Sequence, residues 1–305
     1  STLSASRFNE TRSTAPQTFD PQASFMSSKP AHIRFWNGNK SAPRRRYEAD
    51  LTQQLLSLID PNMVLQVDHS DRLTAQAEAD IFDEGFDLLV TVAGNPKFDA
   101  VQKRIISCPI AFGILGCRIP IYRRDQHARI HATTATPFKA ATIALPADWA
   151  DVPIFQANGY CVATQPSLEA CFEQVACGAV DYLCLGANEV QAIFEDFGKP
   201  FPELVIATGQ VLYYPMPLQF YCHPKALVLQ AQLTAALNEH QRAGGLLNLF
   251  EQHFGAQLYA LDLAKREVHR LRNPFLGDGS SLAEMLSPLL GTAQLKDQNS
   301  VPGTK

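Results

Sequence analysis

The side chains of this sequence that could do chemistry do not form any common catalytic pattern. There is no G-x-S-x-G nucleophile motif, no H-E-x-x-H zinc motif and no G-x-x-x-x-G-K phosphate loop. The eight His residues are scattered without the spacing of metal ligands. We therefore predict no catalytic residue, no metal and no cofactor, so the remaining candidates are side chains that could bind a ligand.

Aromatic and amide side chains that suit a polar ligand stand where apolar segments end. Trp36 and Asn37 close the segment HIRFW (32–36), and an indole wall beside an amide is typical of a solute cleft. The alternative is a Trp that packs at the end of a strand. Trp149, in PADWAD, follows another apolar segment and is our best candidate for a ring on the opposite side of such a cleft.

Three charged candidates each have a second interpretation. Arg118 lies in an otherwise apolar segment, so it needs a carboxylate partner or an anionic ligand, and we favour the internal partner. Asp148 could face a ligand, although we favour the capping of a following helical turn. Glu189 and Asn188 follow VDYLCLG (180–186), where Glu189 either faces a cleft or serves as a first-turn acid.

Two runs of like residues are also candidates. Arg44, Arg45 and Arg46 precede a predicted helix and could attract an anion, but we favour a solvated basic face. Tyr213 and Tyr214 point to opposite faces of an extended segment, so only one of them can face a cleft, and we choose Tyr214.

The elements that must position these side chains alternate between strands and helices. Short apolar or alternating segments predict strands at 32–36, 63–69, 86–94, 141–146, 159–164 and 180–186. Amphipathic segments predict helices at 45–59, 71–85, 167–178, 225–244 and 246–255. This β-α-β alternation is typical of a mostly parallel sheet with helices on both faces.

Two extended, proline-bearing segments, 116–124 and 207–223, resemble crossings between two lobes. A ligand cleft would then lie where the carboxyl ends of the strands meet, and a two-strand hinge would permit closure. The predicted divisions are a flexible leader at 1–30, lobe 1 at 31–119 and 215–292, lobe 2 at 120–214, and a flexible tail at 293–305.

Composition excludes several classes of protein. The 305 residues are 46% hydrophobic, which excludes a disordered chain. A net charge of −4 gives no general attraction to nucleic acid or anionic membranes, and no apolar run reaches the ~18 to 20 residues of a membrane-spanning helix. Seven cysteines leave at least one unpaired, and we expect Cys161 and Cys184 to be buried apolar residues.

The order of three segments along the chain resembles that of a known protein family. The segments are Y-x-x-x-L-x-x-x-L-L (47–56), FDLLVTV (86–92) and CPI-x-x-G-I-L-G-C-R (108–118). Their order is similar to that of the type II periplasmic solute-binding proteins of ABC transporters, in the family 3 group that includes amino-acid receptors. Four further segments resemble a narrower branch of that group. They are LPADWADVPIFQANGYCV (145–162), LEACFEQVACGAVDYLCLGANEV (168–190), LYYPMPLQFY (212–221) and HRLRNP (269–274).

The resemblance covers about residues 32–275 and implies an α/β, two-lobed type II periplasmic-binding-protein fold. Each lobe would be a mostly parallel sheet flanked by helices, joined to the other by two extended hinge crossings. It also implies a periplasmic monomer, its signal peptide removed, with a small polar, amino-acid-like solute and an ABC permease as partners and no nucleic acid. Tyr47 matches the family's helix start and becomes a site candidate.

The sequence departs from the resemblance at both anchors of an α-amino acid. The Arg that usually clamps the α-carboxylate is replaced by Val101 or Gln102, with Arg104 displaced. The Asp that usually holds the amino group falls at Gly186, and the Arg expected in the narrower branch is Leu185. The identity of the ligand is therefore left open.

The leading hypothesis is a non-enzymatic extracytoplasmic protein that captures a small polar solute for an ABC permease. The second is a ligand-sensing domain of a signalling system, and the third is an enzyme on the same fold that uses an acid pair such as Asp148 and Glu189. The predicted ligand-binding residues are Trp36, Asn37, Tyr47, Arg118, Asp148, Trp149, Asn188, Glu189 and Tyr214.

Overall fold

The structure, a computed structural model, describes residues 31–131 and 137–277. The predicted leader and tail lie outside the described residues, and so do residues 278–292 of predicted lobe 1. No helix in the described part of the chain combines the length and the apolar character needed to cross a lipid bilayer.

Helix α1 (Ala42–Ile59) begins three residues before the predicted start at residue 45. The Ser41 side chain accepts a hydrogen bond from the backbone N–H of Arg44, and Pro43 occupies the first turn, where its missing N–H costs nothing. Apolar spacing places Leu58 with Leu51 and Leu55 on one face of this helix, but Leu58 is 61% exposed whereas the other two are buried. The cap and the proline therefore fix this helix start, which periodicity alone placed too late.

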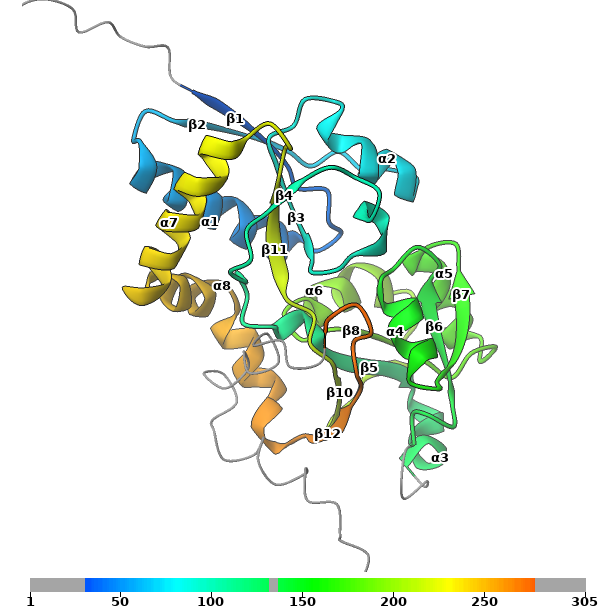
Figure 1. The fold of residues 1–305 in the computed structure, drawn as a ribbon. Coiled ribbons are helices and arrows are strands. Elements are labelled where there is room, and N and C mark those ends of the chain that lie inside the picture. Colours follow the sequence, from blue (N-terminus) through cyan, green and yellow to red (C-terminus); the bar gives the residue numbers. More distant parts are fainter. Residues whose placement is uncertain (1–30, 132–136, 278–305) are drawn as a thin grey trace, which may run out of the picture. The chain divides into compact units, whose positions relative to one another are not determined.

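Among the described residues, five strands form the first sheet, in the order β2 (Val64–Asp68), β1 (His32–Trp36), β3 (Leu88–Val92), β11 (Leu218–Cys222) and β4 (Arg104–Ile105). β1 is parallel to β2 and β3, as the β-α-β alternation predicts, whereas β11 is antiparallel to β3 and β4. Two helices, α7 (Leu227–Arg242) and α8 (Gly245–Leu261), pack against α1 beside this sheet (Figure 1).

The second sheet has the order β12 (Glu267–Arg270), β10 (Gln210–Tyr213), β5 (Cys117–Arg123), β8 (Tyr182–Gly186), β6 (Thr142–Pro146) and β7 (Cys161–Gln165), and β9 (Leu204–Ile206) also pairs with β5. β6 is parallel to β7 and β8, whereas β5 is antiparallel to β8, β9 and β10. Both sheets are therefore mixed, with a parallel core of three strands each.

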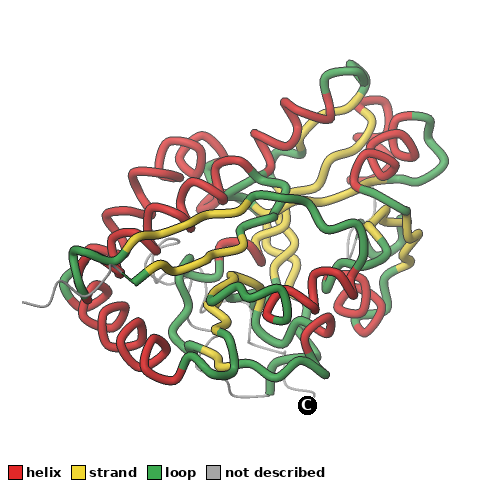
Figure 2. The backbone as a smooth tube through the Cα atoms, turned by 90° about the horizontal axis from the view of Figure 1, so that it is seen from above, coloured by secondary structure: helices red, strands yellow, loops and turns green. Residues whose placement is uncertain are grey.

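Helices α4 (Asp151–Ala157) and α5 (Leu168–Ala176) pack against β6 and β7. Figure 2 shows, from above, helices lying alongside the strands. The shorter helices are α2 (Ala75–Ala79), α3 (His127–His131) and α6 (Val190–Ile193). All described residues belong to one compact unit.

Within the described residues the chain passes between the two sheets three times, and the first two crossings are neighbours. It enters the second sheet at β5 and returns to the first between β10 and β11, and the Tyr214 N–H donates to the Gly116 carbonyl at 3.2 Å. A Cβ on Gly116 would lie 1.9 Å from the Tyr214 oxygen, so only glycine permits this approach. The chain enters the second sheet once more at β12, a strand that periodicity did not predict.

Two local predictions are wrong. The helix predicted over 71–85 is only α2 followed by a 3₁₀ turn (Asp80–Phe82), and it begins where the Thr74 side chain accepts from the Ala77 N–H. Cys184 is buried in β8, but Cys161 is exposed because β7 lies at the edge of its sheet. The predicted lobe boundaries stay predictions.

Candidate functional site

A cavity of about 460 Å³ lies between residues of the first and the second sheet. Its lining includes loops that follow the carboxyl ends of β1, β3, β6, β7 and β8. Because open parallel sheets bind ligands at the carboxyl ends of their strands, the topology brings segments far apart in sequence to one site. A cavity of this size suits a small molecule.

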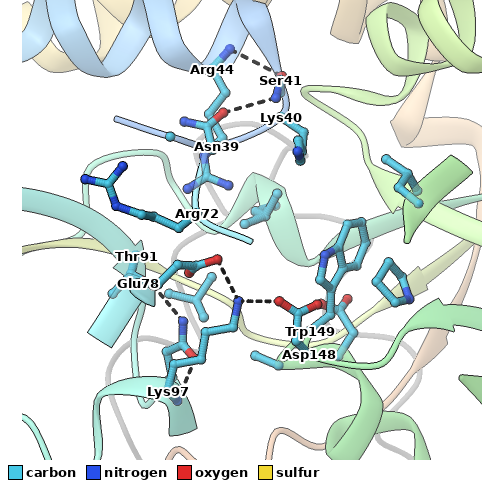
Figure 3. Close-up of a pocket in the computed structure, with 18 of the residues that line it drawn as sticks. Asn39, Lys40, Ser41, Arg44, Arg72, Glu78, Thr91, Lys97, Asp148 and Trp149 are labelled. Carbon is cyan, nitrogen blue, oxygen red and sulfur yellow. Dashed lines mark hydrogen bonds and ion pairs between the residues drawn. The ribbon is translucent and has the colours of Figure 1, made fainter. Parts of the chain in front are cut away.

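Lys97 connects the two sides of the cavity (Figure 3). Its Nζ lies 2.9 Å from Oδ2 of Asp148, which follows β6, and 3.1 Å from Oε1 of Glu78 in α2. Burial opposes the charge of Lys97, but the two carboxylates outweigh it and raise the pKa of its ammonium group. Burial also raises the pKa of Glu78, although Lys97 acts in the opposite direction.

Arg118 holds a second pair of carboxylates, and here all three side chains are buried. It forms an ion pair with Asp151 at the start of α4, and its Nη1 lies 3.5 Å from Oε1 of Glu189. Its Nε donates to the Tyr214 hydroxyl at 2.9 Å, and that hydroxyl donates to Asp151. Burial disfavours the guanidinium charge, but Asp151 and the other neighbours outweigh it and raise the pKa of Arg118.

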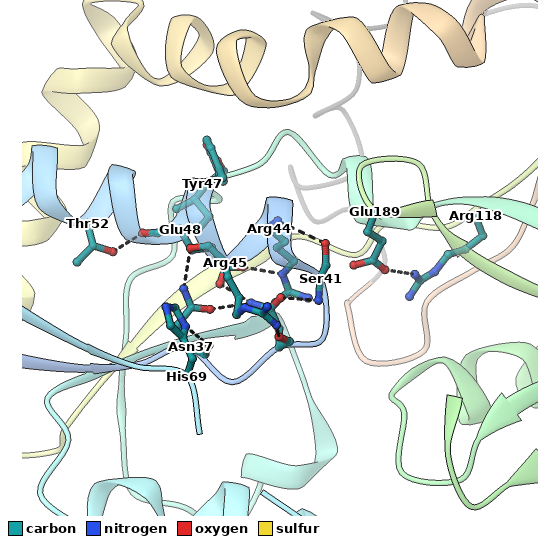
Figure 4. Close-up of polar contacts among 12 residues, drawn as sticks. Asn37, Ser41, Arg44, Arg45, Tyr47, Glu48, Thr52, His69, Arg118 and Glu189 are labelled. Carbon is teal, nitrogen blue, oxygen red and sulfur yellow. Dashed lines mark hydrogen bonds and ion pairs between the residues drawn. The ribbon is translucent and has the colours of Figure 1, made fainter. Parts of the chain in front are cut away.

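A third cluster lies at the start of α1 (Figure 4). Glu48 is buried and accepts from Arg44 Nε at 2.6 Å and from Asn39 at 3.0 Å. Burial raises the pKa of Glu48, while Arg44 lowers it. Arg45 donates to the Asn39 carbonyl, so Arg44 and Arg45 are not the solvated run that we favoured, and only Arg46 is exposed.

The two tryptophans lie on the cavity wall. Trp36 is 7% exposed, its indole N–H donates to the Ser70 carbonyl at 2.9 Å, and the Arg72 guanidinium lies 5.9 Å from its ring centre. Trp36 is thus both packed and part of the lining. Trp149 is half-buried and lies beside Asp148 in Figure 3.

The described residues contain no group of three or more His, Cys, Asp or Glu side chains that could hold a metal ion. The cavity instead combines charged groups, amides and two indoles, and these groups hold polar organic molecules by hydrogen bonds and charge.

No protein-family model and no curated protein matches the sequence. Among solved structures, ArgBP from T. maritima is similar at 15% identity and a TM-score of 0.52, over 74% of this chain and 96% of that one. The periplasmic VFT2 domain of Bordetella pertussis BvgS is 18% identical with a TM-score of 0.55, over 73% of this chain and 93% of that domain. A His/Glu/Gln/Arg/opine family-binding protein from Silicibacter pomeroyi, in complex with lysine, is 12% identical with a TM-score of 0.53, over 73% and 97%.

The chain has the type II periplasmic-binding-protein fold. Similarity to this group of amino-acid-binding proteins extends over most of the chain. Within this fold, six of the nine predicted site residues line the cavity: Trp36, Asn37, Arg118, Asp148, Trp149 and Glu189. Asp148 pairs with Lys97, and α4 has no side-chain cap, so the helix-capping interpretation of Asp148 is wrong.

The other three predicted residues lie outside the cavity lining. Tyr47 is fully buried, and its hydroxyl donates to the Ile110 carbonyl. Tyr214 is fully buried against Arg118, and Asn188 is 1% exposed, with neither of its side-chain polar atoms hydrogen-bonded within the described structure. Their predicted contact with a ligand stays a prediction.

Two charged residues of the cavity lining, Lys97 and Glu78, are not among the site residues predicted from the sequence. The resemblance places the expected ligand anchor near Val101, Gln102 and Arg104, but none of these lines the cavity, and Arg104 donates to the Pro224 carbonyl. The signal for Lys97 was present, since it follows the apolar segment of β3 at the end where parallel strands bind ligands. Glu78 carried no such signal, because α2 was predicted as part of a longer helix.

Proposed function

We propose that this chain is an extracytoplasmic solute-binding protein that holds a small polar solute in the cavity and delivers it to an ABC permease. The observation that carries the proposal is the charged cavity between the two sheets, on a fold shared with a binding protein that holds lysine. The proposal includes a periplasmic location, a monomeric state and the absence of catalysis.

Capture would proceed by closure of the two sides around the solute. Two of the three crossing segments in the described chain touch at Gly116 and Tyr214, and these two extended segments would form the hinge. Lys97 and Asp148 come from opposite sides of the cavity, so their ion pair forms in the closed state and breaks in the open state. A solute that binds the closed state more tightly than the open state would shift the protein toward closure.

A thermal-shift screen of refolded, ligand-stripped protein tests the proposal against amino acids, amines, organic acids, sugars and short peptides. A solute at 100 times its dissociation constant stabilises the fold by about 2.7 kcal/mol, which raises the midpoint by several degrees. Scattering with and without the hit should show a smaller radius in the bound form. A folded protein that responds to no class of compound would refute solute binding.

The variant Trp149→Ala tests whether a compound that raises the unfolding midpoint binds in the cavity. It removes a half-buried wall residue, so we expect the thermal shift to fall sharply. Tyr259→Ala is the matched control, because Tyr259 is 89% exposed on α8 and does not line the cavity. Equal shifts in the two variants would place binding elsewhere.

A sensor function is the second candidate, and similarity to the BvgS VFT2 domain and to a histidine kinase sensor domain supports it. The same solute would then bias a signalling protein instead of a permease. Neighbouring genes discriminate the two, because a transport role predicts genes for a permease and an ATPase, whereas a sensor role predicts a kinase or its regulator.

A further inference from the structure

The cations that line the described cavity each contact a carboxylate already. Lys97 contacts two of them, Glu78 and Asp148, and Arg118 contacts Asp151 and Glu189. The three remaining pairs are Lys40 with Asp71, Arg44 with Glu48, and Arg72 with Glu84. An α-amino acid needs a guanidinium that is free to bind both of its carboxylate oxygens. Each arginine of the described cavity lining instead contacts a carboxylate of the protein.

The same wall carries a surplus of negative charge. Lys97 and Arg118 each neutralise only one of their two carboxylates. Glu169, on the first turn of α5, also lines the cavity, and no ion pair or hydrogen bond of its side chain is seen within the described structure. A carboxylate on the ligand would have to displace an internal one, whereas a cation would complete the charge balance.

A buried donor on the cavity wall identifies a second ligand group. Arg118 has 3% of its side chain exposed, and its Nη1 is a buried donor without a hydrogen bond in the described structure. Its nearest acceptor is Oε1 of Glu189 at 3.5 Å, a contact that supplies opposite charge but no hydrogen bond. Because buried donors are almost always hydrogen-bonded, a further acceptor would complete the contacts of this atom. Because Asp151 and Glu189 already balance the guanidinium charge, that acceptor can be a neutral oxygen.

We propose that the solute is an organic cation with a neutral oxygen acceptor, such as an amide carbonyl, in place of the carboxylate of an α-amino acid. This inference rests on the proposed function. The ammonium group lies among the surplus carboxylates, with the half-buried indole of Trp149 available as a cation–π surface, and the neutral oxygen meets Nη1 of Arg118.

Matched pairs of compounds test the inference by calorimetry at pH 7. The pairs are glycinamide and glycine, lysinamide and lysine, and phenylalaninamide and phenylalanine, which differ only in the amide or carboxylate. We expect the amide to bind at least tenfold more tightly in the pair that fits the cavity. An acid that binds as tightly as its amide, or a screen whose hits are all neutral or anionic, overturns the inference but leaves solute binding intact. A screen with no hit overturns both.

Glu169→Gln tests the charge argument without disturbing a buried pair. Loss of one exposed carboxylate should weaken binding of the amide about two- to five-fold, and added salt should reduce the difference. Glu173→Gln is the matched control, since Glu173 is exposed on the same helix but does not line the cavity. An unchanged or tighter amide affinity in Glu169→Gln, or an equal loss in the control, contradicts the assignment.

Discussion

Arg118 and Lys97 each hold two carboxylates on the cavity wall, but their surroundings differ. Arg118 and both of its partners are at most 8% exposed, and all belong to segments of the second sheet and its helices. Lys97 is 13% exposed, Asp148 is 46% exposed, and their pair joins the two sides of the cavity.

The difference indicates two functions for the same chemistry. Burial of an ion pair removes both charges from water at a large cost in free energy, so good geometry and further hydrogen bonds are needed to maintain it. The Tyr214 hydroxyl provides such hydrogen bonds, because it accepts from Arg118 and donates to Asp151. A partly exposed ion pair contributes less to the free energy of unfolding, and separating its partners costs less because water can solvate both charges. We therefore interpret the Arg118 cluster as permanent and the Lys97 pair as the contact that can open.

The largest expected effect belongs to Arg118→Met. Removal of the guanidinium leaves Asp151 and Glu189 buried without a counter-charge, so we expect a loss of about 3 to 5 kcal/mol in the free energy of unfolding. Urea denaturation at pH 7 measures it. Arg118→Lys, which keeps the charge but not the planar fork, should lose less. A loss below about 1 kcal/mol in Arg118→Met would mean that the cluster does not hold these segments together.

A smaller effect is expected for Lys97→Met, which leaves Glu78 partly buried without its cation. The free energy of unfolding should fall by about 1 to 3 kcal/mol at pH 7, as measured by urea denaturation. Lys225→Met is the control, because Lys225 does not line the cavity, and this variant should change the free energy of unfolding little.

The pH dependence of the Lys97 effect has a defined sign. The pKa of Lys97 is raised in the folded protein above its ordinary value of 10.5, so its charged form favours folding. The stability difference between the wild type and Lys97→Met should therefore be complete below pH 10.5 and decline as the pH rises through the folded pKa. Urea denaturation of both proteins at pH 8 and pH 11 checks this, and an increase at pH 11 would contradict it.

The smallest effect on stability is expected for Asp148→Asn. Asp148 is half-exposed and Lys97 keeps Glu78, so the loss should stay below about 1 kcal/mol. The variant should nevertheless enlarge the scattering radius of the ligand-free protein, because the pair across the cavity is weakened. An unchanged radius would remove Lys97 and Asp148 from the closure mechanism.

Much of the fold could be predicted because its signals are local. HIRFW gives β1 with the predicted bounds, and the segment from 167 to 178 gives α5, since the apolar spacing of each matches one element. The failures are also physical. α2 ends early at a 3₁₀ turn, and β12 is a short, half-exposed strand whose pairing with β10 depends on a neighbour 57 residues away.

The sequence by itself determined which side chains stand at the carboxyl ends of strands, so Trp36, Trp149 and Glu189 could be placed on the cavity wall. Only the tertiary structure decided their partners. Lys97 meets Asp148 across 51 residues of chain, and such a contact leaves no periodic trace in either segment. Periodicity reports the burial of a face, whereas the pairing of charges depends on how separate segments are brought together in space.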